Sequence, residues 1–298
     1  MTPAVEVIEF TDPGCPWSWG AEPVLRWLRH AYGESLRWRR VQGVQIDRAP
    51  RAQPEDPSEV VRDRWLEIAA HTGAPVPTRL HWAIGSSHMA ARAAKAAERQ
   101  GGELADRVLR TLREAVFVHG RPADSPERIA SALSHVPGLD RDRLGADLYA
   151  HDVVIAADAD YGEARRPHAD VILLKGPGPH PGAARRDGDY QRYAFPTLVF
   201  RGRRGVRLVP GWREAAVYRQ ALEAVEPTLA GVEIRPLAPA QALARWGSIT
   251  DRELELLCGW ADPPPDAVEV RTATSSLWVD SERAAAGHRA RAIAEVTR

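Results

Sequence analysis

Cys15 is the residue of this chain best placed to do chemistry. It follows a short apolar stretch, Val5 to Phe10, and precedes Pro16, which opens an amphipathic pattern typical of a helix. Proline suits the first helical position, because its missing N–H would have no partner there, so Cys15 is predicted to be the N-cap. A thiol at a helix N-terminus faces free N–H groups and the positive end of the helix dipole, which lower its pKa. We therefore expect a nucleophilic thiolate at Cys15.

Ser18 stands three residues after Cys15, at the third predicted helical position. Its hydroxyl can cap the helix or hydrogen-bond the thiolate, and the pattern does not separate these two roles. Trp17 and Trp19 can cover a peptide or a small aromatic ligand, or they can pack on neighbouring helices. Cys15 itself has a plainer alternative, since free cysteines are often small buried residues.

Cys258 is the only other cysteine, and it lies in the apolar stretch from Leu256 to Trp260. We interpret it as a buried structural residue, and two cysteines are too few for a disulfide scaffold. Cys15 is therefore expected to act alone. A lone reactive thiol must resolve its mixed disulfides with a second thiol, supplied by a small molecule or by a partner protein.

A second motif, Phe195-Pro196-Thr197, leads directly into an apolar stretch over residues 198–200. Proline is tolerated at the start of a strand, and the peptide bond before Pro196 can be cis. The motif therefore predicts a short strand that is opened by a proline.

In this order, the motifs resemble the DsbA-like superfamily, in which a helical domain is inserted into a thioredoxin fold. The more specific similarity is to its cytosolic FrnE-like and ClpXP-adaptor (YjbH-like) branches, and it is carried by residues 11–13, 15–17, 19–23, 112–117 and 120–121. The resemblance implies that Pro196 lies beside Cys15, and that Phe195, Pro196 and Thr197 form a groove in which substrate backbone binds. It fails at Ser18, where oxidoreductases of the superfamily place a resolving cysteine.

A second branch of the superfamily implies a different chemistry. Kappa-class glutathione transferases and 2-hydroxychromene-2-carboxylate isomerases share the fold, and their Ser-Pro-Tyr-Ser-Trp-like motif uses its first serine to activate glutathione. The pattern of Pro16, Ser18 and Trp19 is similar, with Cys15 in the place of that serine. A cysteine there can form a mixed disulfide as well as hold a thiol ligand.

Three functions follow from these resemblances. The first is a single-cysteine thiol oxidoreductase-like protein that forms mixed disulfides with a protein or a low-molecular-weight thiol. The second is an isomerase or transferase that depends on a thiol cofactor, and the third is a non-enzymatic proteolysis adaptor or redox sensor. We expect no tightly bound cofactor, with glutathione or mycothiol as candidate small thiols.

The composition and charge of the chain limit the other classes of function that it could have. The chain has 298 residues, 44% of them hydrophobic, and its 40 basic residues are balanced by 40 acidic ones. Nucleic acid binding is therefore not indicated by charge. The sequence shows no signal peptide pattern and no apolar run near 18 residues, so we expect a cytoplasmic protein that does not enter a membrane. His81, His88 and His119 lack the spacing of metal ligands, and no metal site is predicted.

Periodicity predicts an α/β protein, and the resemblance implies a thioredoxin fold with a large inserted helical domain, followed by a small C-terminal extension. The expected boundaries are 1–48 and 193–228 for the thioredoxin-like domain, 49–192 for the inserted domain and 229–298 for the extension. Pro23 predicts a kink in the helix from Pro16 to Tyr32. Helical patterns in the insertion cover residues 58–71, 87–99, 103–118, 126–134 and 141–157. Residues 165–192 are rich in Gly, Pro and Arg and predict a long surface loop.

The extension has its own pattern. Thr250 and Glu253 form a capping box at the start of a helix that ends near Leu257, and two short strands are predicted at 268–270 and 277–279. These elements suit either a winged-helix-like module or an extension that packs over the sheet. A protein partner could bind the helical domain or this tail.

Overall fold

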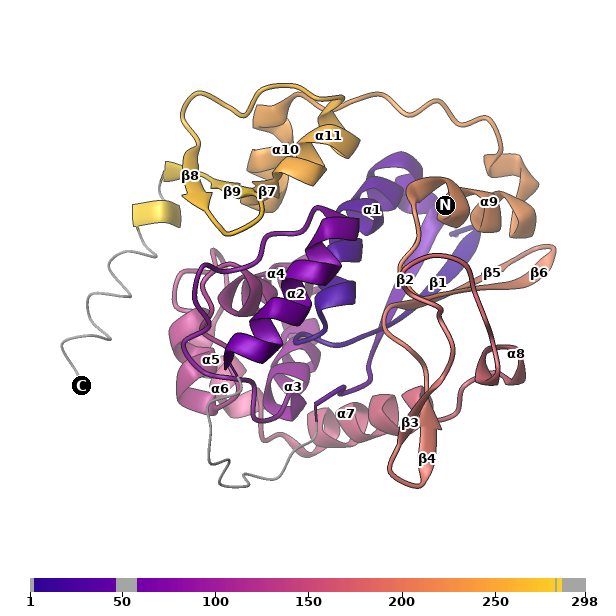
Figure 1. Ribbon diagram of the computed structural model, residues 1–298, viewed down its shortest axis with the longest axis horizontal. Helices are drawn as coiled ribbons and strands as arrows, with labels where there is room; N and C mark the ends of the chain where they lie inside the picture. Colours follow the sequence, from indigo (N-terminus) through magenta and orange to yellow (C-terminus); the bar gives the residue numbers. More distant parts are fainter. Residues whose placement is uncertain (1–2, 47–57, 282, 286–298) are drawn as a thin grey trace.

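A mixed four-stranded sheet lies at the centre of the fold, in the strand order β2-β1-β5-β6 (Figure 1). The computed structural model describes residues 3–46, 58–281 and 283–285. β1 (Val5–Thr11) pairs in parallel with β2 (Leu36–Gln42) and antiparallel with β5 (Thr197–Gly202), which continues as a hairpin into β6 (Gly205–Pro210). The predicted α/β class is confirmed.

Alternation along β1 divides the core into two layers. Val7 points into a cluster that contains Leu28 of α1 (Pro16–Tyr32) and Leu222 of α9 (Ala215–Val225). The neighbouring residue Ile8 points to the opposite face, as strand geometry requires, and packs in a second cluster with Cys15 and Phe195. The cysteine therefore belongs to the layer away from α1's buried face.

Helix α1 begins as the sequence predicts. Its N-cap is Cys15, which has extended backbone angles, and Pro16 occupies the first helical turn. Pro23 lies inside the same helix. Elsewhere, short 3-10 helices cover Gly33–Ser35, Glu98–Gln100 and Pro227–Leu229.

Among the described residues, six helices lie between β2 and the segment 165–192 that returns the chain to β5. They are α2 (Ser58–Thr72), α3 (His88–Ala97), α4 (Gly102–Phe117), α5 (Pro126–Ala132), α6 (Arg141–Asp147) and α7 (His151–Ala164). The single helix predicted over 141–157 is wrong, because α6 and α7 are separate helices. The predicted domain boundaries remain predictions, and the one at residues 48 and 49 lies outside the described residues.

Residues 165–192, predicted to be a long surface loop, contain regular elements. They contain the short helix α8 (Ala169–Ile172) and a two-stranded hairpin of β3 (Arg185–Asp187) and β4 (Tyr190–Arg192). One backbone bond inside the segment runs from Ala184 N–H to the Val171 carbonyl at 2.7 Å, and another joins its two ends, from Tyr193 N–H to the Ala164 carbonyl at 2.9 Å.

The C-terminal extension packs on α1 (Figure 1). Its elements are α10 (Pro239–Trp246), β7 (Ser248–Thr250), α11 (Asp251–Cys258), β8 (Val268–Arg271) and β9 (Ser276–Val279), with the strands in the order β7-β9-β8. The capping box is confirmed, since Thr250 N–H donates to Glu253 at 2.7 Å and Glu253 N–H donates to the Thr250 hydroxyl at 3.2 Å. Helix α10 and strand β7 were not predicted.

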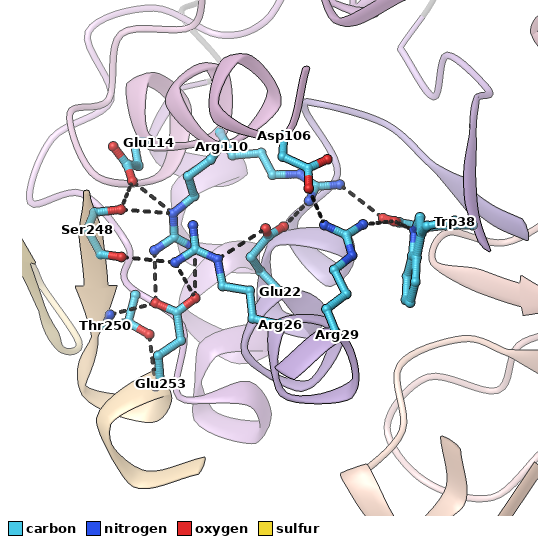
Figure 2. Close-up of polar contacts among 12 residues, drawn as sticks. Glu22, Arg26, Arg29, Trp38, Asp106, Arg110, Glu114, Ser248, Thr250 and Glu253 are labelled. Atoms are coloured by element: carbon cyan, nitrogen blue, oxygen red, sulfur yellow. Dashed lines mark hydrogen bonds and ion pairs between the residues drawn. The ribbon is translucent and has the colours of Figure 1, made fainter. Parts of the chain in front are cut away.

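A buried ionic network fastens the extension to α1 and α4 (Figure 2). Arg110 donates to both carboxylate oxygens of Glu253, at 3.1 and 3.0 Å, and Arg26 lies 3.1 Å from the same carboxylate. Glu114 accepts bonds from Arg110 at 2.8 Å and from Arg283 at 2.5 Å. Burial alone would raise the pKa of Glu114, but Arg283 and Arg110 lower it to about 2. Glu253 thus anchors the first turn of α11 to α1 and α4. A winged-helix-like role for the extension remains a prediction.

Candidate thiol site

Strand pairing brings Cys15 and Phe195 together. Phe10, near the end of β1, lies opposite Thr197, at the start of β5. The loop that follows β1 and the residues that precede β5 must therefore meet at the same end of the sheet. There the Cys15 thiol donates to the carbonyl oxygen of Phe195 at 3.5 Å, and the Phe195–Pro196 peptide bond is cis.

Asp12 holds the cysteine loop in place. One carboxylate oxygen accepts the Gly14 N–H at 2.6 Å, and the other accepts the Gln45 N–H and the Ser87 hydroxyl, each at 2.6 Å. The side chain is fully buried, so these donors replace its water shell. Asp12 therefore joins the cysteine loop to the segment after β2 and to the residue before α3, a role that its place in the Thr-Asp-Pro motif did not predict.

The expected thiolate is wrong for this conformation. Cys15 is 1% exposed, and burial raises the pKa of its thiol. The Ser18 backbone N–H and hydroxyl oppose this by stabilising the thiolate; Asp12 adds to the rise, and Arg192 opposes it. Loss of solvation outweighs the helix terminus, so the resting Cys15 side chain is a protonated thiol.

Most of the other predicted site residues are buried close to Cys15. Ser18 is fully buried beside Cys15, and within the described residues its hydroxyl has no nitrogen or oxygen partner. Phe195 and Thr197 are also buried, and Thr197 donates its hydroxyl to the Ala194 carbonyl at 2.6 Å. The Pro196 carbonyl accepts the Gly211 N–H at 2.8 Å. These residues meet at the cysteine, but in this conformation they do not form an open groove.

Trp17 is half-buried and packs against the apolar cluster that contains Cys15. Its ring lies 5.0 Å from the ring of His180, edge to face, and 6.3 Å from that of Trp212. On another side it stacks at 6.4 Å on His71 of α2. Pro16 is likewise half-buried, so Pro16 and Trp17 are the parts of the motif nearest to solvent.

Trp19 lies apart from these residues. It is buried against Phe117 of α4, with ring centroids 5.9 Å apart, and its indole N–H donates to the Pro75 carbonyl at 3.0 Å. The guanidinium of Arg110 lies 4.5 Å from the centre of its ring. Trp19 thus packs between α1 and the inserted helices, as the structural alternative predicted.

His180 is a site residue that sequence reasoning missed. Its ring is buried, and Nδ1 accepts the Gly182 N–H at 3.1 Å. Burial, together with the charges of Arg185 and Arg213, lowers the pKa of His180 to about 4, so the ring is neutral at pH 7. The available signal was its position between Pro179 and Pro181, which restrict the backbone of a histidine in an otherwise glycine-rich stretch.

Arg192 is the second missed residue. Its guanidinium lies 4.8 Å from the centre of the Phe195 ring and donates to the Tyr193 carbonyl at 2.9 Å. Its positive charge lowers the pKa of Cys15, and it is the only basic group that does so among the leading influences on that thiol. Only the structure shows that this arginine faces the cysteine, because its strand was not predicted.

In the described ranges, no three His, Cys, Asp or Glu side chains are grouped in a way that could hold a metal ion. No helix in the described part of the chain is long and apolar enough to cross a membrane.

The fold and site define a thioredoxin-type protein. The chain belongs to the family described as Thioredoxin, which matches residues 9–165, just over half of its length. It is 26% identical over 160 residues to the ClpXP adapter protein SpxH of Bacillus subtilis (strain 168), covering 52% of each chain. The SpxH of Bacillus licheniformis is 28% identical over 158 residues, again covering 52% of each chain. The chain thus spans about half the length of these curated relatives.

Solved structures share the same fold. A putative protein disulfide isomerase from Nitrosomonas europaea superposes with a TM-score of 0.57 at 18% identity, covering 74% of this chain and 96% of the other. A probable DsbA oxidoreductase from Streptomyces coelicolor gives a TM-score of 0.54 at 18% identity, covering 78% and 93%. The predicted thioredoxin fold is therefore confirmed.

Proposed function

We propose that this protein carries out thiol–disulfide exchange through Cys15 alone, forming a mixed disulfide that a second thiol resolves. The observation that carries the proposal is the position of the Cys15 sulfur at the N-cap of α1, 3.5 Å from the carbonyl oxygen before Pro196. Ser18 occupies the position of a resolving cysteine, so the second thiol must come from solution or from a partner. Glutathione and mycothiol are the small thiols that we consider.

Each residue of the site has a part in this reaction. A substrate first displaces the cover formed by Trp17 and His180, since Cys15 is 1% exposed. Water or substrate then replaces the apolar contacts of the sulfur, and the Ser18 groups and Arg192 stabilise the thiolate that attacks. The thiolate breaks a disulfide bond, forms a new one with Cys15 and releases the other half as a thiol. Phe195, Pro196 and Thr197 shape the wall against which the mixed disulfide lies.

An assay of catalysed disulfide reduction tests the proposal. The protein should catalyse reduction of bis(2-hydroxyethyl) disulfide by glutathione, and Cys15→Ala should abolish the activity. Cys258→Ala is the matched control, because Cys258 is buried in α11 and should leave the rate unchanged. Equal activity in wild type and Cys15→Ala would refute the proposal. Tight binding of glutathione without exchange would instead favour the thiol-cofactor isomerase or transferase.

A proteolysis adaptor is the second candidate, favoured by the printed name of the SpxH relatives. It predicts that the purified chain binds the ClpX hexamer, measured by analytical size-exclusion chromatography. Cys15→Ala should bind as well as wild type, because an adaptor uses surface contacts rather than the buried thiol. Absence of binding by both proteins would rule out a direct ClpX contact.

A further inference from the structure

The β3–β4 hairpin holds two like charges opposite each other near the thiol site. Arg185 and Arg192 are direct partners in its antiparallel register. Like charges directly opposite each other on two paired strands are destabilising. Arg186 is the next residue along β3, so it points to the opposite face of the hairpin.

Carboxylates in the described residues do not neutralise this pair. Asp187 shares the face of Arg185, but it forms a short ion pair with Arg165 and lies 3.8 Å from the Nε of Arg192. In the described part of the chain, no carboxylate lies within ion-pair distance of Arg185. Asp187 therefore pairs with the guanidinium groups of Arg165 and Arg192, Arg185 adds a further positive charge, and the face keeps an excess of positive charge.

This face adjoins the cysteine through Phe195. The Arg192 guanidinium lies over the ring of Phe195 at 4.8 Å, and the carbonyl of the same residue accepts the Cys15 thiol at 3.5 Å. The Arg192 side chain is 11% exposed, so water screens its charge only weakly, whereas Arg185 is exposed and open to a ligand. A ligand that reaches the sulfur therefore lies near Arg192, and Arg185 is the partner of Arg192 across the hairpin.

We propose that Arg185 and Arg192 bind a carboxylate of a low-molecular-weight thiol whose sulfur exchanges with Cys15. The planar guanidinium matches a carboxylate with two parallel hydrogen bonds. A small ligand fits the site better than a protein disulfide, because Cys15, Phe195 and Thr197 are all buried. The inference rests on the proposed exchange reaction and adds the class of its substrate.

The reaction leaves the number of disulfide bonds unchanged. The Cys15 thiolate attacks one sulfur of the small disulfide, that sulfur–sulfur bond breaks, and a new one joins Cys15 to the attacked half. The other half leaves as a thiolate and takes up the proton that Cys15 lost. No further oxidant or reductant is needed.

Rates of adduct formation at Cys15 with three symmetrical disulfides test the proposal. Glutathione disulfide carries carboxylates, bis(2-hydroxyethyl) disulfide is neutral and cystamine carries ammonium groups. Each rate, measured by intact-protein mass spectrometry, is divided by the rate of the same reagent with 2-mercaptoethanol. At low salt the normalised rate for glutathione disulfide should exceed the neutral one by about tenfold. The preference should shrink as salt is added, because the exposed arginine is screened.

Charge-matched variants locate the effect. R185Q should remove most of the preference for glutathione disulfide, whereas R186Q removes the same charge from the other face and should retain it. R192K keeps the charge without the planar fork and should retain part of the preference.

Two results would overturn the inference alone: equal normalised rates for the three reagents, or equal losses in R185Q and R186Q. If no reagent modifies Cys15, the exchange reaction itself is refuted, and the inference falls with it.

Discussion

The Cys15 thiol donates to the carbonyl oxygen of Phe195 across 3.5 Å, although 180 residues separate the two in sequence. The contact joins the N-cap of α1 to the residue before Pro196 and leaves Cys15 1% exposed. A site with this geometry protects its thiol at rest. Its reactivity depends on what opens the cover and on which groups then stabilise the thiolate.

The first prediction concerns the acidity of Cys15. The thiolate ultraviolet absorbance of wild type, minus that of Cys15→Ala, should titrate with a midpoint above the ordinary thiol value of about 8.5, because burial raises the pKa. Ser18→Ala should move the midpoint higher still, since the Ser18 hydroxyl stabilises the thiolate. A wild-type midpoint below about 7 would show instead that the helix terminus dominates.

The second prediction concerns the ring of Phe195. A Cβ added at Gly43 would overlap Phe195 Cζ and lie 2.8 Å from the Cβ of Ala164, so Gly43→Ala should displace the ring. We expect a loss of about 1–3 kcal/mol in the free energy of unfolding, measured with urea. Gly162→Ala is the matched control: it lies inside α7, where the new Cβ meets no atom within 4 Å apart from its chain neighbours and the backbone of its own helix, and it should stabilise by about 0.5–1 kcal/mol. Equal effects of the two substitutions would contradict this packing.

Local sequence patterns predicted the elements that position the thiol. The N-cap at Cys15, the helix that begins at Pro16 and the strand after Pro196 all depend on residues close in sequence. Such signals do not report burial. The sign of the Cys15 pKa shift was therefore wrong, because solvation depends on residues as distant as Phe195.

Ion pairs between residues far apart in the chain could also not be predicted from the sequence. Arg110 and Glu253 lie 143 residues apart, and neither shows a pattern that identifies the other as its partner. The β3–β4 hairpin has strands of only three residues each, too short for a clear alternation. The segment that contains its arginines was therefore predicted to be a surface loop.

The third prediction concerns the anchor of the extension. Glu253→Ala leaves the guanidinium groups of Arg26 and Arg110 buried without this carboxylate, which should cost about 3–5 kcal/mol of unfolding free energy. Glu255→Ala removes a carboxylate that pairs with Arg252 on the same helix and should cost under about 1 kcal/mol. Urea unfolding of both variants gives the comparison. A loss below about 1 kcal/mol for Glu253→Ala would mean that the network does not hold the extension.

The fourth prediction is a pH dependence set by His180. Its pKa is about 4 in the folded protein and near 6.5 when unfolded, so between these values the unfolded chain binds the proton. Stability should therefore rise with pH from about 4 to 6.5 and then level off, with a contribution of about 3 kcal/mol from this group.

His180→Asn isolates this contribution, because its side-chain oxygen can still accept the Gly182 N–H but does not titrate. The difference in unfolding free energy between wild type and variant should change across the same pH window. A constant difference from pH 4 to 7 would show that His180 is not buried in the neutral form.

The site of disulfide modification tests the central claim most directly. Wild-type protein is treated in its native state with bis(2-hydroxyethyl) disulfide, and peptide mapping measures the adduct on Cys15 and on Cys258. The account predicts one adduct, on Cys15, that excess thiol reverses and that Cys15→Ala lacks. Cys15 that stays unmodified in the native protein, but reacts once the chain is unfolded in urea, would contradict a role in thiol exchange.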